Sequence, residues 1–210
     1  MGFPFSDYNC GMKPEDTTPM SDIERRDYYR MEDRVHLIRT PLEKHLISED
    51  PYGDQYNIPR QALLISQLQA IDNDSRDLLR QVGDYNRALG SYLRAMDEKI
   101  ELLAKYVVSH DKELAQKEPV NLSEGGISYY DGSPLTLGSY LHLIIVLFPS
   151  YSSVAAIGLV RTCEKIEEQP VIYRVGVEFQ VLLEADRKLI VRHIRRRQSQ
   201  AIREQGLKSD

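Results

Sequence analysis

The most regular pattern of apolar positions in the chain runs from residue 60 to residue 118, a stretch without proline. Apolar residues recur there at alternating steps of three and four, which is a heptad repeat. A sustained heptad repeat predicts helices that associate along an apolar seam. The seam residues are Leu68, Ile71, Leu78, Val82, Tyr85, Leu89, Tyr92, Met96, Leu103 and Tyr106.

The apolar face of this region is wider than a two-stranded coiled coil needs. Leu79, Leu93 and Ile100 flank the seam on one side, and Ala88 and Leu102 flank it on the other. A two-stranded coil exposes charged residues at such positions. We therefore expect a bundle of about four helices, with a homotetramer favoured.

Two routes lead to such a bundle, and the sequence leaves both open. Single long helices from several chains would associate, or each chain would contribute a helix pair. Gly83 and Gly90 mark the weakest points, because glycine costs about 1 kcal/mol relative to alanine inside a helix. A third possibility is a hairpin that folds back and packs on the rest of its own chain.

The remainder of the chain alternates apolar and polar residues in short runs that predict strands. The runs are 34–39, 126–130, 141–148, 154–163 and 171–181, and turn residues separate them. Short strands at regular spacing predict a small antiparallel barrel. Residues 184–203 then predict a helix with one apolar side, which should pack on the barrel.

The expected fold class is therefore α+β, a small antiparallel β-barrel that a long heptad-patterned helical insertion interrupts and a C-terminal helix completes. The expected organisation is a flexible N-terminal tail at 1–22, a barrel with its C-terminal helix at 23–42 and 119–204, and an oligomerising coiled-coil insertion at 43–118.

Composition narrows the function classes. The net charge is −5, and the acidic excess lies in residues 1–118, which argues against a general nucleic-acid binder. Cys10 and Cys163 show no spacing typical of a zinc site or a disulfide framework. The longest apolar run is too short to span a bilayer, and the N-terminus does not resemble a signal peptide. We expect a cytoplasmic protein without a metal site or a membrane-inserted segment.

Two polar motifs stand beside predicted strands. Arg26 and Arg30 form an RxxxR, with Arg25 adjacent, just before the first strand, and Asn121-Leu-Ser-Glu-Gly-Gly126 precedes another. In this order they resemble the PilZ domain family, bacterial receptors for cyclic di-GMP. Residues 173–179 look like the late strand of that family and 186–198 like its terminal helix. The resemblance covers roughly residues 22–42 and 119–204.

The resemblance implies a role for each motif residue. Arg26 and Arg30 would contact guanine and phosphate, and Arg25 would add a third positive charge. Asn121 would contact a guanine edge, Ser123 would offer a hydroxyl, and Gly125 and Gly126 would let the backbone approach the ligand or adopt positive φ. Arginine suits this ligand because its guanidinium can bind guanine O6 and N7, pair with phosphate and stack on a base.

Two features depart from the family pattern. The family often has Asp at the position of Asn121, and the amide lacks the carboxylate that would accept from guanine N1–H and N2–H. About 90 residues separate Arg30 from Asn121, where a short hairpin is usual.

Each of these polar features also has an explanation that involves no ligand. The early arginines lie among acidic residues, so surface ion pairs would also explain them. Residues 121–126 could be only a turn before a strand. The basic run 192–197 is more typical of a solvated helix face than of a phosphate or nucleic-acid contact.

The sequence contains no catalytic constellation and no cofactor fingerprint. We expect a non-enzymatic signalling receptor or adaptor that binds cyclic di-GMP, assembles through its coiled coil and passes the signal to a downstream protein. The alternative is an oligomeric scaffold of PilZ type that binds the nucleotide very weakly or not at all and acts through protein-protein contacts.

Overall fold

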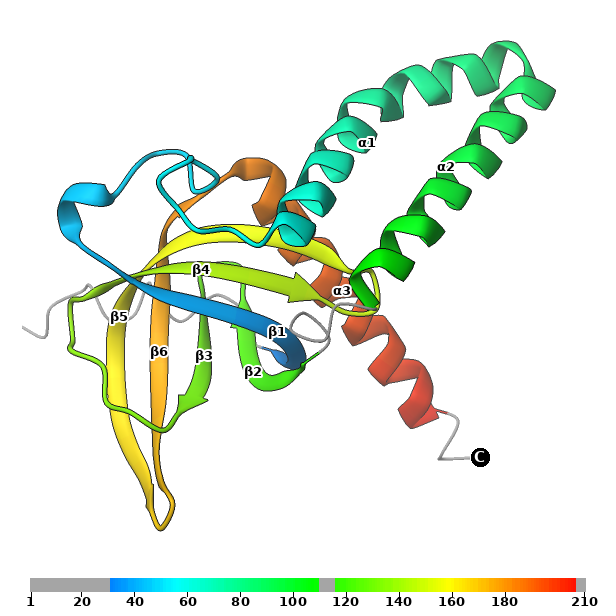
Figure 1. The fold of residues 1–210 in the computed structure, drawn as a ribbon. Helices are drawn as coiled ribbons and strands as arrows, with labels where there is room; N and C mark the ends of the chain where they lie inside the picture. Colours follow the sequence, from blue (N-terminus) through cyan, green and yellow to red (C-terminus); the bar gives the residue numbers. More distant parts are fainter. Residues whose placement is uncertain (1–30, 110–115, 207–210) are drawn as a thin grey trace, which may run out of the picture.

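The computed structural model describes residues 31–109 and 116–206. Six strands close into a barrel, a hairpin of two helices projects from it, and a third long helix packs at one end (Figure 1). The elements are β1 (Met31–Leu42), the short helix η2 (Lys44–Leu46), α1 (Arg60–Tyr85), α2 (Arg87–Ser109), β2 (Glu118–Ser123), β3 (Gly126–Asp131), β4 (Tyr140–Leu147), β5 (Ser152–Glu168), β6 (Val171–Leu182) and α3 (Glu184–Gly206). The expected α+β class is confirmed.

The helical segment separates strand β1 in sequence from β2 to β6, yet β1 closes the barrel between β2 and β4. Its first half, from Met31 to Val35, pairs with β2, and its second half, from His36 to Leu42, pairs with β4. All pairs are antiparallel, in the order β1-β2-β3-β6-β5-β4 around the barrel. The insertion therefore leaves the barrel closed.

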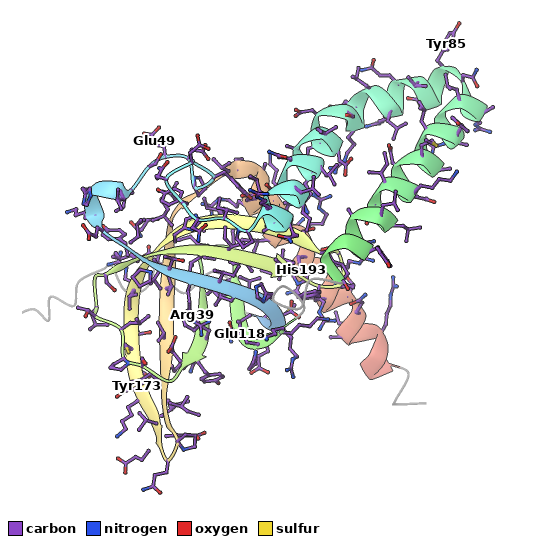
Figure 2. The ribbon with its side chains drawn as sticks, in the orientation of Figure 1. Arg39, Glu49, Tyr85, Glu118, Tyr173 and His193 are labelled. Atoms are coloured by element: carbon purple, nitrogen blue, oxygen red, sulfur yellow. The ribbon has the colours of Figure 1, made fainter. Side chains whose placement is uncertain are left out.

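Arg39 lies just past the point where β1 stops pairing with β2 and begins to pair with β4. Figure 2 labels Arg39 on β1 and Glu118 at the start of β2. The Arg39 guanidinium binds Glu118 at 2.7 Å and Asp131 on β3 at 3.0 Å, and it lies over the Tyr129 ring. These contacts tie three strands together where the β1–β2 ladder ends.

The barrel interior is a continuous apolar core that α3 completes. Val35, Leu122 and Leu143 are fully buried inside it, and Ile190 and Ile194 of α3 pack against the same cluster. Burying side chains of this size contributes roughly 1.5–3 kcal/mol each. The helix thus closes one end of the barrel.

Strand β4 is buried on both faces, which explains its unbroken apolar run. Ile144 and Val146 point away from the core and pack under Ala62 and Ile65 of α1. The segment between η2 and α1 adds Tyr52, whose hydroxyl donates to Asp186 of α3 at 2.8 Å and accepts from the Ala155 backbone N–H at 3.1 Å.

The heptad region forms two antiparallel helices that meet at Asn86. The Asn86 side-chain oxygen accepts a hydrogen bond from the Leu89 N–H at 3.1 Å and so caps the start of α2. A Cβ on Gly90 would lie 2.5 Å from the Gly83 Cα, so the two helices touch at their glycines. The chain therefore forms a helix pair and not one long helix.

Only the base of this hairpin packs on its own barrel. Within α1 the buried residues are Ala62 and Ile65, whereas Ile71, Leu78 and Tyr85 are 60%, 63% and 95% exposed. On α2 the exposed seam residues are Leu89, Tyr92, Met96, Leu103 and Tyr106, and on α1 Leu68 and Val82 are half-buried. A single chain thus leaves most of the predicted seam facing solvent.

The sequence analysis missed strand β2. It assigned Glu118 to the helical region and read Asn121 to Gly126 as a loop before a strand, and both assignments are wrong. Glu118 begins β2, and Asn121 and Ser123 lie within it, so only Glu124 and Gly125 form the turn. Residues 118–123 form a strand because Val120 and Leu122, at alternate positions, are buried in the core.

Among the residues that the structure describes, no helix is long and apolar enough to cross a membrane. Within the same ranges, no three or more His, Cys, Asp or Glu side chains are grouped to hold a metal ion.

Candidate ligand pocket on the outer face of the barrel

An open pocket of about 520 Å³ lies on the outer face of the barrel, across β2, β3, β6 and β5. It is lined by Asn121, Ser123, Gly125, Gly126, Ile127, Ser128, Arg161, Thr162, Glu164, Arg174, Gly176, Val177, Glu178, Phe179 and Arg187. Four residues of the second sequence motif therefore meet in one place.

The pocket exists because the outward positions here carry small side chains. In the strand register Asn121 lies beside Ser128, Ser128 beside Gly176, and Gly176 beside Thr162, so one row crosses four strands. A Cβ on Gly176 would lie 2.4 Å from the Thr162 hydroxyl oxygen. The absence of a side chain at Gly176 therefore leaves room for the Thr162 side chain over the floor of the pocket.

Asn121 contributes an unused hydrogen-bonding atom to this row. Its Oδ1 is buried and has no hydrogen-bond partner in the part of the chain that the structure describes. An unsatisfied buried acceptor costs about 1–3 kcal/mol, which a ligand donor would recover. Such an atom suits recognition of an N–H group.

Ser123 has a structural task in addition to its place in the pocket. It is 8% exposed, and its hydroxyl donates to the Gly126 carbonyl oxygen at 3.1 Å across the β2–β3 turn. A ligand would meet this hydroxyl through its remaining acceptor capacity.

Of the two roles expected for Gly125 and Gly126, positive φ is wrong, whereas close approach of the backbone to a ligand stays a prediction. Among the described residues Gly138 is the glycine with a positive φ, of 79°. Gly126 is needed for a different reason, because a Cβ there would lie 2.3 Å from the Val177 carbonyl oxygen. It allows β3 to approach β6 closely.

Three arginines of the pocket were not predicted from the sequence, and each lies near a carboxylate. Arg161 on β5 pairs with Glu178 on β6, and Arg174 on β6 stands opposite Glu164 on β5 in the register. Arg187 donates to the Glu124 carbonyl oxygen at 3.3 Å, and its guanidinium lies 3.8 Å from the Glu124 carboxylate. The positive charge of the pocket is therefore largely balanced by neighbouring acids.

Arg161 owes its position to a β-bulge. The register shifts between Val160 and Thr162, which face Val177 and Gly176, so Arg161 has no partner residue on β6. Bulges redirect side chains in this way. Simple alternation of polar and apolar residues does not reveal a bulge.

The first sequence motif lies outside the described residues, which start at Met31. Arg25, Arg26 and Arg30 therefore have no described side chain. Met31 pairs with Leu122, the residue before Ser123, so β1 begins beside the pocket.

A buried ion pair fastens this start of β1 to α3. Asp33 is 7% exposed and binds His193 Nε2 at 2.5 Å and Arg197 Nε at 3.2 Å. Burial alone would raise the pKa of Asp33, but the hydrogen bonds from His193 and the Arg34 backbone, with the charges of His193 and Arg197, lower it overall. The carboxylate is thus held in its charged form. Figure 2 labels His193 on α3.

Fold and pocket together define a class of protein, namely a small antiparallel barrel with a polar pocket on its outer face. The sequence profile of the PilZ domain matches residues 91–196, half of the chain, and this range includes strands β2 to β6. The chain belongs to the PilZ domain family, as the sequence analysis predicted. The match begins within α2, so β1 lies outside it.

One solved structure with a similar fold agrees with this assignment. A pathogenic protein from Xanthomonas campestris, described as a tetrameric PilZ domain that self-assembles through an unusual helical bundle, is 15% identical with a TM-score of 0.51. The alignment covers 84% of this chain and 92% of that one.

Two further structures align over less than half of the chain. The inhibitor of motility from Bacillus subtilis is 22% identical, with 40% and 44% of the two chains covered and a TM-score of 0.35. MrkH from K. pneumonia is 16% identical, with 42% of each chain covered and a TM-score of 0.36. Comparison with curated proteins gives no match.

Proposed function

We propose that this protein is a cytoplasmic signalling receptor or adaptor that binds cyclic di-GMP in the pocket over β2, β3, β6 and β5. As a coiled-coil oligomer it relays the signal to a protein partner. The observation that carries this proposal is the pairing of Met31 with Leu122, because it puts the residue after the RxxxR motif at the edge of the pocket.

Chain geometry supports the meeting of the two motifs. Consecutive Cα atoms are about 3.8 Å apart, and paired strands are about 4.8 Å apart. Arg30 directly precedes Met31 in the sequence, and Arg26 lies four residues before Arg30. A chain of this length therefore allows both arginines to reach Asn121 and Ser123.

The charge of the pocket explains why these arginines are needed. Cyclic di-GMP carries two phosphodiester charges and two guanines. Arg161 and Arg187 already contact carboxylates of the chain itself, so the described pocket offers few uncommitted cations. Arg25, Arg26 and Arg30 would supply the positive charge that the ligand requires.

Isothermal titration calorimetry with cyclic di-GMP tests the proposal. We expect the wild-type protein to bind with micromolar or tighter affinity, and Arg26→Ala and Arg30→Ala to lose about 10–100-fold, since a bidentate arginine contact to guanine provides about 1–3 kcal/mol. Arg203→Ala, an exposed arginine near the end of α3, is the control and should bind normally. Unchanged heats in both motif variants would contradict the proposal.

One observation favours the alternative of a scaffold that does not depend on the nucleotide. The acids Glu164 and Glu178 line the pocket, Glu124 lies beside it, and Asn121 takes the place of the usual Asp. These carboxylates would repel phosphate. An intact oligomer that gives no heat with cyclic di-GMP would favour this alternative over the receptor.

The exposed seam of the helical hairpin supports the oligomeric part of the proposal. Ile71, Leu78 and Tyr85 are exposed at intervals of seven residues along α1. A row of this kind is stabilised when other helices cover it. The Xanthomonas campestris protein of similar fold is described as a tetramer assembled through a helical bundle, which agrees with the homotetramer favoured here.

A further inference from the structure

The Arg161–Glu178 pair presents free hydrogen-bonding atoms to the pocket. Arg161 contacts Oε2 of Glu178 through its Nε atom, and both side chains line the pocket. Among the described residues, the Nη groups of Arg161 and Oε1 of Glu178 make no other hydrogen bond. A donor group and an acceptor oxygen are thus left side by side.

This arrangement complements guanine. Its Watson–Crick edge presents the O6 acceptor next to the N1–H and N2–H donors, so O6 faces the Arg161 donors while the two N–H groups face the Glu178 carboxylate, which only accepts. Adenine presents an N6–H donor and the N1 acceptor instead. Its N1 lone pair would face the carboxylate oxygen and be repelled.

The neighbours of Glu178 leave room for a base. Its register partner on β3 is Gly126, and Gly176 lies two residues earlier on β6. Neither glycine has a side chain, and the next outward residue on β3 is Ser128. The floor between Glu178 and Asn121 is therefore formed by backbone and one small hydroxyl.

We propose that Arg161 and Glu178 read the Watson–Crick edge of one guanine in this pocket, with Glu178 supplying the carboxylate that Asn121 lacks. This inference rests on the proposed function and assigns the base specificity of the same site. The β-bulge that frees Arg161 from the β6 register places its guanidinium beside Glu178.

The test compares cyclic di-GMP with cyclic di-IMP, which lacks the 2-amino groups, and with cyclic di-AMP, each by calorimetry. Wild-type protein should prefer cyclic di-GMP over cyclic di-IMP about tenfold, since hydrogen bonds to a charged group are strong. Cyclic di-AMP should bind more weakly still. In Glu178→Gln the preference over cyclic di-IMP should fall to about twofold.

Two further variants separate recognition from general effects. Arg161→Ala should weaken cyclic di-GMP and cyclic di-IMP by the same factor, because both carry O6. Glu168→Gln, an exposed glutamate at the end of β5, is the matched control and should keep the wild-type preference. The unfolding midpoints of the variants should match the wild type, because exposed ion pairs contribute little to stability.

The outcomes distinguish the two proposals. A tenfold preference that persists in Glu178→Gln would overturn the assignment of Glu178 while leaving the receptor function in place. A wild-type protein that binds none of the three cyclic dinucleotides would overturn both.

Discussion

Asp33 shows how much one residue contributes to the arrangement of the pocket. It lies near the start of β1, is almost completely buried, and binds His193 and Arg197 of α3. Because the same strand begins beside the pocket, this carboxylate fixes both the position of β1 and the contact with the helix that closes the barrel. Removing one partner of a buried ion pair leaves the other charges uncompensated.

We expect Asp33→Asn to lower the free energy of unfolding by about 3 kcal/mol near neutral pH. The pKa of Asp33 is lower in the folded state than its ordinary value of 3.8. Its contribution is therefore fully present above that value and is lost as the pH falls through the folded pKa. Denaturant unfolding as a function of pH should show the difference between wild type and variant shrinking below pH 3.8.

Asp54→Asn, at an exposed position, is the control for this measurement and should follow the wild type at every pH. The opposite result would be free energies of unfolding of wild type and Asp33→Asn that differ by the same amount down to strongly acidic pH. That result would show that the charge of the Asp33 carboxylate does not stabilise the fold.

At the residue scale, the sequence predicted what depends on residue type and missed what depends on register. Asn121, Ser123, Gly125 and Gly126 line one pocket, and their role in binding a ligand stays a prediction. Arg161 was missed because a β-bulge directs its side chain toward the pocket, and bulges follow from strand pairing rather than from local composition. The roles of Arg25, Arg26 and Arg30 remain predictions.

At the scale of elements, the helical hairpin depends on the contact between Gly83 of α1 and Gly90 of α2. The two helices approach so closely there that a Cβ on Gly90 would lie 2.5 Å from the backbone of Gly83. The two glycines are not equivalent, however. A Cβ on Gly83 would meet only the flexible end of Arg94, at 3.2 Å.

Opposite effects are therefore expected from the same substitution at the two glycines. Gly83→Ala should stabilise the protein by up to about 1 kcal/mol through helix propensity. Gly90→Ala should destabilise it by about 1–2 kcal/mol, because overpacking against backbone outweighs that gain. Chemical unfolding followed by circular dichroism measures both. Equal stabilisation by the two substitutions would contradict the close contact.

Most elements could be predicted because each has a clear hydrophobic period. Strands β3 to β6, β1 and α3 follow their patterns, and the heptad region is helical up to Ser109 within the described residues. β2 was missed because its only signal is two alternating apolar residues, Val120 and Leu122, next to Pro119. A helix pair was one of several possibilities that the sequence left open, and its break falls at Asn86, between Gly83 and Gly90.

At the scale of the whole molecule, the apolar row along the hairpin is exposed to solvent in a single chain. We expect replacement of Leu89 and Leu103 by Asp to disrupt assembly, because charges would then be buried between helices. Light scattering should give four times 24.2 kDa for the wild type and a mass near that of one chain for the double variant.

Ile202→Asp on α3 is the control, since this apolar residue is 70% exposed but lies outside the hairpin, and its mass should equal that of the wild type. A monomeric wild-type protein would refute assembly through the seam.

The hairpin and the pocket share no residue, because the pocket is built from β2, β3, β5, β6 and the start of α3. Copies joined along helices about 39 Å long would keep every pocket open to solvent. Such a multivalent particle gains avidity: a downstream protein with repeated contact sites could be held about 10²–10⁴-fold more tightly than by one barrel. Under the proposed receptor function, binding of the cyclic dinucleotide to these pockets would change which of the multivalent complexes form.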